Sequence, residues 1–191
     1  MDLILASTSP YRKMLIERLG VPFRCEDPGV DEAPWKGRIG DPRELAETLA
    51  LVKAASVAER FPGSAVIGGD QVAACDGQVL GKPGTTERAV AQLLGMAGRP
   101  HELITALAVI APGGARQVLD VATLTMRPLD RAAIERYVDA ERPVDCAGSY
   151  KLEERGIALF ERIEAADHSA ITGVPLIALT SILRELGFVL P

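Results

Sequence analysis

Leu3-Ile4-Leu5-Ala6-Ser7-Thr8-Ser9-Pro10 is the stretch of sequence that decides the fold. Its four consecutive apolar residues are typical of a strand that is buried on both faces, as in sheets covered by helices. A polar turn follows, after which Met14 and Leu19 lie on one stripe of a helix that stops at Gly20. The stretch therefore predicts a strand, a turn and a helix at the start of an α/β domain.

Strand and helix patterns go on alternating along the chain. We expect strands at residues 65–75, 78–80, 102–111, 117–127 and 157–163. We expect three helices to begin after the caps Asp41, Thr85 or Thr86, and Asp130, and a last helix to run from about residue 175 to 186. Asp76-Gly77 is a strong hairpin signal. Because no linker rich in Pro, Gly and Ser divides the chain, residues 1–191 are predicted to form a single α/β domain with a mixed sheet.

The composition excludes several classes of protein. Lysine and arginine number 21 against 26 aspartates and glutamates, and the net charge of −5 argues against a binder of nucleic-acid polymers. Three scattered cysteines form no disulfide framework and suit a reducing compartment, and two histidines are too few for a His-rich metal centre. No uncharged apolar run reaches about 18 residues, so we expect a cytoplasmic protein that does not span a membrane.

The turn after the first strand predicts an anion-binding site. Ser7 and Ser9 supply hydroxyls beside the free backbone N–H groups of a helix N-terminus, and Arg12 adds a guanidinium fork that suits phosphate oxygens. A capped helix with a surface arginine is the alternative interpretation of the same residues.

Three acids lie near the ends of predicted strands. Asp31 and Glu32 are adjacent, and the sequence does not separate their roles. Asp70 follows the apolar run 65–69, where a carboxylate cannot be left unpaired. Asp70 is therefore a ligand for a hard cation, a general base for water, or the partner of a lysine.

Two lysines and one polar cluster complete the set of candidates. Lys53 lies at the edge of an apolar helical stripe, Lys82 lies in a Gly-Lys-Pro turn, and small polar residues occupy 146–153. The two histidines, His101 and His168, lie in ordinary polar segments, and we expect neither to be catalytic.

Taken together, these clusters resemble the Maf family of nucleoside triphosphate pyrophosphatases. The motifs that carry the resemblance, in the family's order, are Leu5-Ala6-Ser7-Thr8-Ser9-Pro10, Val30-Asp31-Glu32, Lys53, Gly69-Asp70-Gln71, Gly81-Lys82-Pro83, Ala147-Gly148-Ser149-Tyr150-Lys151 and Gly173-Val174-Pro175-Leu176. The resemblance implies an α/β fold shared with inosine triphosphate pyrophosphatases, with an elongated mixed sheet flanked by helices in two lobes around a central cleft. It also implies hydrolysis of a nucleoside triphosphate between the α- and β-phosphates, giving the monophosphate and pyrophosphate, with a divalent metal such as Mg²⁺ or Mn²⁺.

The family's functional positions fall on the residues noted above. The resemblance assigns the general base to Asp70 and the acidic metal-side position to Glu32, with Asp70 beside it as a second metal ligand. It assigns phosphate binding to Ser7, Ser9, Arg12, Lys53 and Lys82. A triphosphate carries about four negative charges, so an acidic protein has to gather its cations around one cleft to hold it.

Three further positions resemble the branch of the family that hydrolyses 7-methyl-GTP. The branch that acts on dTTP and UTP typically has Arg, Thr and Gln where this chain has Tyr11, Gln71 and Glu153. A carboxylate at Glu153 accepts hydrogen bonds from N1–H and the 2-amino group of a guanine base, and the face of Tyr11 suits the positive charge of a 7-methylguanine.

Two alternatives remain open. One is a dTTP/UTP pyrophosphatase of the same family, and the other is a nucleotide-sensing regulator of cell division without turnover. The joint presence of Asp70 and Glu32 favours catalysis, because a purely binding site has no use for two acids beside a polyphosphate unless a metal lies between them. The resemblance also implies a homodimer.

Overall fold

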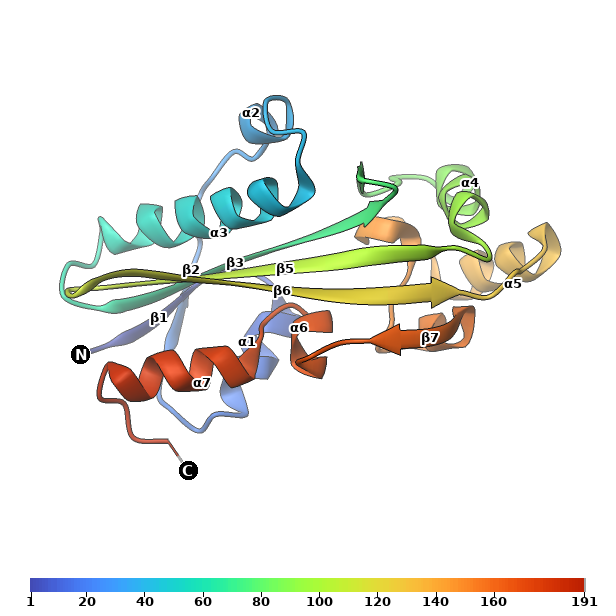
Figure 1. The fold of residues 1–191 in the computed structure, drawn as a ribbon. Coiled ribbons are helices and arrows are strands. Elements are labelled where there is room, and N and C mark those ends of the chain that lie inside the picture. The colour runs from blue at the N-terminus through green and yellow to red at the C-terminus, as the bar shows by residue number, and fades with distance from the viewer. Residues whose placement is uncertain (191) are drawn as a thin grey trace.

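A seven-stranded mixed sheet forms the centre of the molecule in a computed structural model, which describes residues 1–190 (Figure 1). The strand order is β2-β1-β3-β5-β6-β7, and β4 pairs with β3 outside this path. Strand β1 pairs in parallel with β2 and β3, and the other pairs are antiparallel. The strands are β1 (Leu3–Ala6), β2 (Arg24–Glu26), β3 (Ala65–Cys75), β4 (Gln78–Leu80), β5 (Pro100–Ala111), β6 (Gly114–Met126) and β7 (Phe160–Glu164).

Seven helices and two 3-10 turns connect and cover the strands in the described chain. Side-chain oxygens of Ser9, Asp41, Thr85 and Asp130 cap four of the helices as hydrogen-bond acceptors, which stabilises each N-terminus. The helices are α1 (Pro10–Glu17), α2 (Ala33–Lys36), α3 (Pro42–Ala58), α4 (Thr86–Met96), α5 (Arg131–Glu141), α6 (His168–Ile171) and α7 (Leu176–Glu185), and the 3-10 turns are η1 (Ala147–Ser149) and η2 (Arg155–Leu159).

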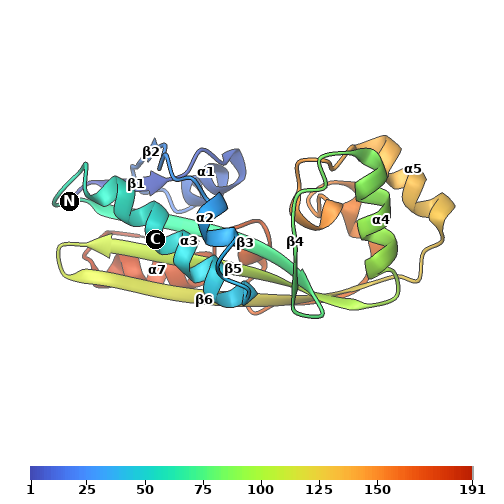
Figure 2. The ribbon, with the colours of Figure 1, turned by 90° about the horizontal axis from the view of Figure 1, so that it is seen from above.

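The long strands β3, β5 and β6 run through two lobes (Figure 2). In the larger lobe α3 covers one face of the sheet and α7 lies against the other (Figure 1), so Leu49 and Leu179 belong to separate apolar clusters. In the smaller lobe α4 and α5 enclose a third cluster around Leu93 and Phe160. The expected elongated mixed sheet with helices in two lobes is therefore confirmed.

Helix α3 approaches strand β3 most closely at Gly68. A Cβ atom on Gly68 would lie 2.3 Å from the carbonyl oxygen of Ala50 and 2.7 Å from the backbone nitrogen of Ala54. Glycine is therefore the residue that allows the helix backbone to contact the strand. This contact places the same turn of α3, which carries Lys53, over the strand position of Asp70.

Most of the expected elements are present, with differences where the sequence pattern is weakest. The Asp76-Gly77 hairpin forms with positive φ at both residues, as its turn type requires. The strand expected at 157–163 begins at Phe160, because residues 155–159 form a 3-10 turn against the small-lobe core and Ile157 is exposed. The short, largely exposed strand β2 lies ahead of Asp31 and Glu32, where a strand was expected but its bounds were not, since three residues carry no burial pattern.

None of the helices in residues 1–190 is both long enough and apolar enough to cross a bilayer.

Candidate active site

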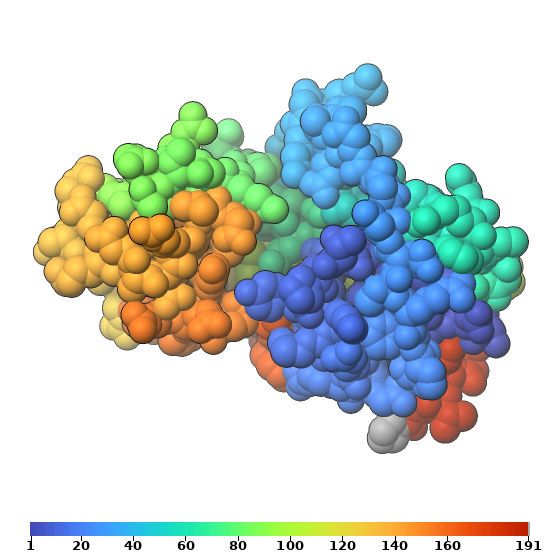
Figure 3. Space-filling view, turned by 180° about the vertical axis from the view of Figure 1, so that it is seen from behind, coloured from blue at the N-terminus to red at the C-terminus, as the bar shows by residue number. Residues whose placement is uncertain are grey.

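A cavity of about 620 Å³ lies between the two lobes. Figure 3 shows the hollow between the blue segments of the large lobe and the orange segment of the small lobe. The large lobe contributes the β1–α1 turn, α2, α3, β3 and residues 171–173, and the small-lobe side contributes residues 79–82 and 145–153. Of the site residues that the resemblance assigned, all but Ser7 line this cavity, and the candidate acid Asp31 does not line it.

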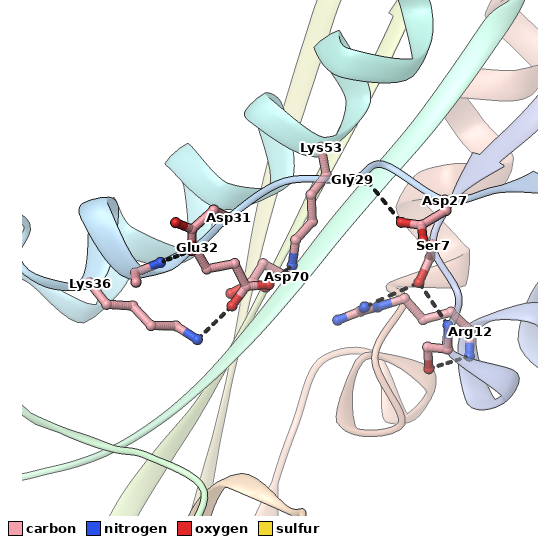
Figure 4. A network of polar contacts seen from close by, with 11 residues as sticks. Ser7, Arg12, Asp27, Gly29, Asp31, Glu32, Lys36, Lys53 and Asp70 are labelled. Carbon is pink, nitrogen blue, oxygen red and sulfur yellow. Dashed lines mark hydrogen bonds and ion pairs between the residues drawn. The ribbon is translucent and has the colours of Figure 1, made fainter.

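Lys53 joins two of the expected acids inside the cavity. Its ammonium nitrogen lies 2.6 Å from Oδ1 of Asp70 and 2.6 Å from Oε1 of Glu32. The other oxygen of Glu32, Oε2, accepts a hydrogen bond from Lys36 at 2.5 Å. Figure 4 shows Lys53 and Lys36 reaching Glu32 from opposite sides. The result is a chain of alternating charges in the order Lys36, Glu32, Lys53 and Asp70.

The surroundings of Asp70 and Glu32 shift the pKa values of the two carboxyl groups in opposite directions. Burial raises the pKa of Asp70, and the cations of Lys53 and Arg12 oppose this shift without cancelling it. Partial burial also disfavours the charged form of Glu32, but hydrogen bonds from Lys36 and Lys53 outweigh it and lower its pKa to about 2. Glu32 is therefore a permanent anion, whereas Asp70 is a stronger base than a solvated aspartate.

The β1–α1 turn holds Arg12 at the edge of the same cavity. Nε of Arg12 donates to the carbonyl of Gly173 at 3.2 Å and Nη1 donates to Oγ of Ser7 at 3.5 Å. Ser7 is buried behind Arg12, and its Oγ also accepts from the backbone N–H of Ser9 at 3.1 Å. Burial lowers the pKa of Arg12, but a guanidinium stays charged. Ser7 thus positions Arg12, while Ser9 and Arg12 face the cavity.

Three residues were expected to select the nucleotide base. All three line the cavity, but their side chains are not equally available to a ligand. Tyr11 and Glu153 are exposed, so both side chains are available to a ligand. The amide nitrogen of Gln71 instead donates to Oγ1 of Thr105 at 2.9 Å and to the carbonyls of Ala170 and Ile171 at 3.0 Å. Gln71 therefore braces the loop that forms one cavity wall.

Lys82 reaches the cavity from the opposite side to α3. It is exposed in the turn after β4, and Gln92 of α4 donates a hydrogen bond to the adjacent carbonyl of Gly81 at 3.0 Å. Lys82 is therefore a cation that the small-lobe side contributes to the cavity.

Two buried tyrosines hold the wall formed by residues 145–153. Oη of Tyr137 accepts a hydrogen bond from the backbone N–H of Lys151 at 3.0 Å, and Oη of Tyr150 lies 3.1 Å from Nε2 of His101. His101 was expected in an ordinary polar segment. That interpretation is wrong, because the side chain points into the small-lobe core and is 2% exposed.

Cys146 also lines the cavity but is not a nucleophile. Burial, together with the neighbouring charge of Asp145, raises the pKa of its thiol to about 11. The thiolate that would attack a substrate is therefore scarce at neutral pH.

The donor set fits a divalent metal only in part. In the described part of the chain no group of three or more His, Cys, Asp or Glu side chains is arranged to hold an ion. Glu32 and Asp70 are close enough to share one ammonium, however, and Mg²⁺ is commonly held by one or two carboxylates together with substrate phosphates and water. The pair therefore fits such an ion if phosphate oxygens supply the remaining ligands.

Sequence reasoning missed Lys36 and His101. The spacing of Glu32 and Lys36 is that of neighbours on a helix surface, so the local pattern contained a signal for this pair. His101 and Tyr150 are 49 residues apart, and no local pattern connects them.

The chain is similar to proteins of one family along nearly its whole length. The family model described as "Maf-like protein" matches residues 2–186. A protein from Xanthomonas oryzae pv. oryzae named 7-methyl-GTP pyrophosphatase is 52% identical over 189 residues, which cover 99% of this chain and 98% of that protein. A protein of the same name from Bdellovibrio bacteriovorus is 46% identical over 184 residues, which cover 96% of each.

One solved structure shows a weaker likeness. It is described as a nucleoside-triphosphatase / dITP/XTP pyrophosphatase from Mycobacterium abscessus and is 19% identical, with a TM-score of 0.45 over 68% of this chain and 76% of that one. A likeness of this size bears on neither the fold nor the function.

Proposed function

The chain belongs to the Maf family, and from that premise we propose that it hydrolyses nucleoside triphosphates to monophosphate and pyrophosphate, with a preference for 7-methyl-GTP. The names of relatives that are 46–52% identical over nearly the whole chain support this activity and this substrate.

The observation that carries the proposal is the arrangement of charges in the cavity. Lys53, Arg12 and Lys82 approach one space from three elements, and Asp70 lies among them. A triphosphate needs several cations around one site, and a net charge of −5 leaves few places on this protein where they meet.

Asp70 acts in this proposal as the general base. Its raised pKa suits a group that takes a proton from an attacking water. As the water oxygen bonds to phosphorus, the bond between the α- and β-phosphate units breaks and pyrophosphate leaves. The Lys53, Arg12 and Lys82 cations stabilise the charge that develops on the phosphate oxygens.

The proposal includes a divalent ion held by Glu32 and Asp70. Such an ion supplies Lewis-acid stabilisation of phosphate charge when it is bound. Lys53 contacts both carboxylates in the structure, so its ammonium has to move toward the phosphates when the ion enters. Ser7 and Ser9 contribute by holding Arg12 and by presenting a hydroxyl at the helix N-terminus.

Base selection is assigned to Tyr11, Glu153 and Gln71. Glu153 accepts from the guanine edge and Tyr11 offers a ring face to the cationic base, while Gln71 keeps the wall in place. The proposal places the enzyme in the cytoplasm, in keeping with its three free cysteines, and retains a homodimer as a prediction for measurement in solution.

A substrate panel tests the activity. The protein is incubated with 7-methyl-GTP, GTP, dTTP and UTP in Mg²⁺ or Mn²⁺, and pyrophosphate and orthophosphate are measured separately. Release of pyrophosphate, fastest from 7-methyl-GTP, is expected. Faster turnover of dTTP and UTP would assign the chain to the other substrate class, and no release from any nucleotide while binding persists would replace the enzyme with a nucleotide sensor.

A further inference from the structure

Tyr150 lines the cavity, while its hydroxyl contacts a residue that does not. The side chain is 6% exposed and lines the cavity near Glu153. Its Oη lies 3.1 Å from Nε2 of His101, a residue that does not line the cavity. The phenol oxygen is therefore directed into the small lobe, and ring carbon is what remains to face a ligand.

The His101 side chain makes its hydrogen bond to Tyr150 and otherwise contacts aromatic rings. It lies on β5 and packs edge-on against the Tyr150 ring and at a tilt against Phe160, with ring centroids 5.5 and 5.7 Å away. Its other nitrogen, Nδ1, is buried without a hydrogen-bond partner in residues 1–190. Burial lowers the pKa of His101 to about 4, so the imidazole is neutral at pH 7. A neutral imidazole shares one hydrogen bond with a phenol in either tautomer.

The backbone on both sides of Tyr150 is held in place. Gly148 has a φ of +77°, and a Cβ atom there would lie 2.8 Å from Cε1 of Tyr150. The next peptide is held by the hydrogen bond from Lys151 to Tyr137. Since Oη is the one polar atom of the Tyr150 side chain, its contact with His101 favours the rotamer that directs it into the small lobe.

We propose that His101 is a positioning residue for base selection, which keeps the Tyr150 hydroxyl inside the small lobe so that the cavity wall beside Glu153 is apolar ring carbon. This inference rests on the proposed function for the identity of the ligand, a purine base with an attached phosphate.

Loss of the imidazole has a defined consequence. In His101→Leu the phenol has no partner in the lobe, and a buried hydroxyl without one is costly, so another χ1 rotamer of Tyr150, which places Oη in the water of the cavity, becomes favoured. That hydroxyl and its water narrow the space for the base, which penalises the larger purine more than a pyrimidine. When Tyr150→Phe is added, no hydroxyl remains to move and the apolar wall returns.

The test measures base binding without turnover. Isothermal titration calorimetry is carried out with 7-methyl-GMP and with UMP, in the absence of metal, on wild type, His101→Leu, Tyr150→Phe and the double variant. We expect His101→Leu to weaken 7-methyl-GMP binding roughly tenfold while UMP binding changes much less. Tyr150→Phe alone, which keeps the ring at the cavity wall, is the reference for the double variant, and the double variant should recover the ratio of the two affinities seen in wild type. In turnover assays KM for 7-methyl-GTP should rise in His101→Leu while kcat changes little.

Two controls separate positioning from stability. His168→Leu makes the same substitution at an exposed histidine that lines a different hollow. Val138→Ala lowers the thermal midpoint from within the same apolar cluster. Neither should change the ratio of the two affinities, and a change with Val138→Ala would attribute the effect to destabilisation and overturn the proposal.

Other outcomes are also decisive. Unchanged selectivity in His101→Leu, or no recovery in the double variant, would refute the role of His101. If His101→Leu does not fold, the double variant still tests the proposal, because a loss of selectivity in the double variant would refute it. Absence of turnover in wild type would refute the proposed function while the binding ratios still stand. Wild type that binds neither monophosphate would overturn the inference itself.

Discussion

The ammonium nitrogen of Lys53 lies 2.6 Å from Oδ1 of Asp70, and this contact joins helix α3 to strand β3 inside the cavity. Both side chains are about 10% exposed. A buried pair of this kind is costly to break from one side, because the remaining charge has neither water nor a partner. Lys53 also contacts Glu32, so the three groups respond to substitution as one unit.

Asp70→Asn should lower turnover about a thousandfold, the scale of a lost general base. The protein should stay folded, because Lys53 keeps Glu32 as its counter-ion. Release of pyrophosphate and the thermal midpoint are measured together. Asp76→Asn, at the exposed hairpin, is the matched control and should turn over as wild type. Wild-type turnover in Asp70→Asn would remove Asp70 from the catalytic role.

Lys53→Met should let a divalent cation bind without nucleotide. In wild type the ammonium occupies the space between Glu32 and Asp70, and its removal leaves Asp70 without a contacting cation and Glu32 with Lys36 alone. Binding to the folded state raises the thermal midpoint, so Mn²⁺ should stabilise the variant far more than wild type. Lys13→Met, which breaks an exposed lysine–glutamate pair on α1, should show no such gain. Equal Mn²⁺ effects on Lys53→Met and wild type would count against a metal site at these acids.

Gly68→Ala should disturb the site through the fold. The added Cβ would lie 2.3 Å from the carbonyl of Ala50, so α3 has to move away from β3 and carries Lys53 with it. We expect a loss of about 1–3 kcal/mol in the free energy of unfolding, as in overpacked cores, together with reduced turnover. Gly95→Ala in α4 is the control, since its Cβ meets nothing within 4 Å, and it should be neutral or stabilising. Both are measured by urea unfolding.

Glu153→Gln should shift selectivity away from 7-methyl-GTP. The amide replaces a charged acceptor by one that also donates, which weakens pairing with the N1–H and amino donors of guanine. The ratio of kcat/KM for 7-methyl-GTP to that for UTP should fall about tenfold, the scale of one charge-assisted hydrogen bond. Glu154→Gln alters the adjacent exposed carboxylate, which does not line the cavity, and should leave the ratio as it is. An unchanged ratio in Glu153→Gln would contradict its role in base recognition.

Stability should depend on pH through His101. Burial lowers its pKa from 6.5 to about 4. As pH falls through this interval the unfolded chain takes up the proton and the folded chain does not, so stability is complete above 6.5 and is lost toward 4. The loss should be about 3 kcal/mol. Urea unfolding as a function of pH checks it, and His101→Leu should lack this component. The same slope in the variant would assign the dependence to other groups.

Local patterns predicted much of the fold for a physical reason. A cap such as Asp41 bonds to backbone groups two and three residues away, and the Asp76-Gly77 turn needs only its own two residues to adopt positive φ. Such features depend on neighbours in sequence. The bounds of strand β2 and the 3-10 turn at 155–159 were missed because tertiary packing rather than propensity holds them.

The candidate site, like the fold, was predicted only in part from local patterns. The resemblance of short motifs pointed to Ser9, Arg12 and Lys82, and these residues do line the cavity. It did not indicate that Ser7 lies behind Arg12, or that the Gln71 amide is bonded within the protein. Those facts depend on which element packs against which.

Residue patterns along the chain were enough to predict an α/β fold with capped helices, a tight hairpin and a set of charged residues suited to a phosphate ligand. Tertiary structure alone decided that Lys53 lies between Glu32 and Asp70 and that His101 meets Tyr150. The physical reason is that such contacts join separate elements. Their distances are set by backbone packing, as at Gly68, and not by the residues that flank each partner.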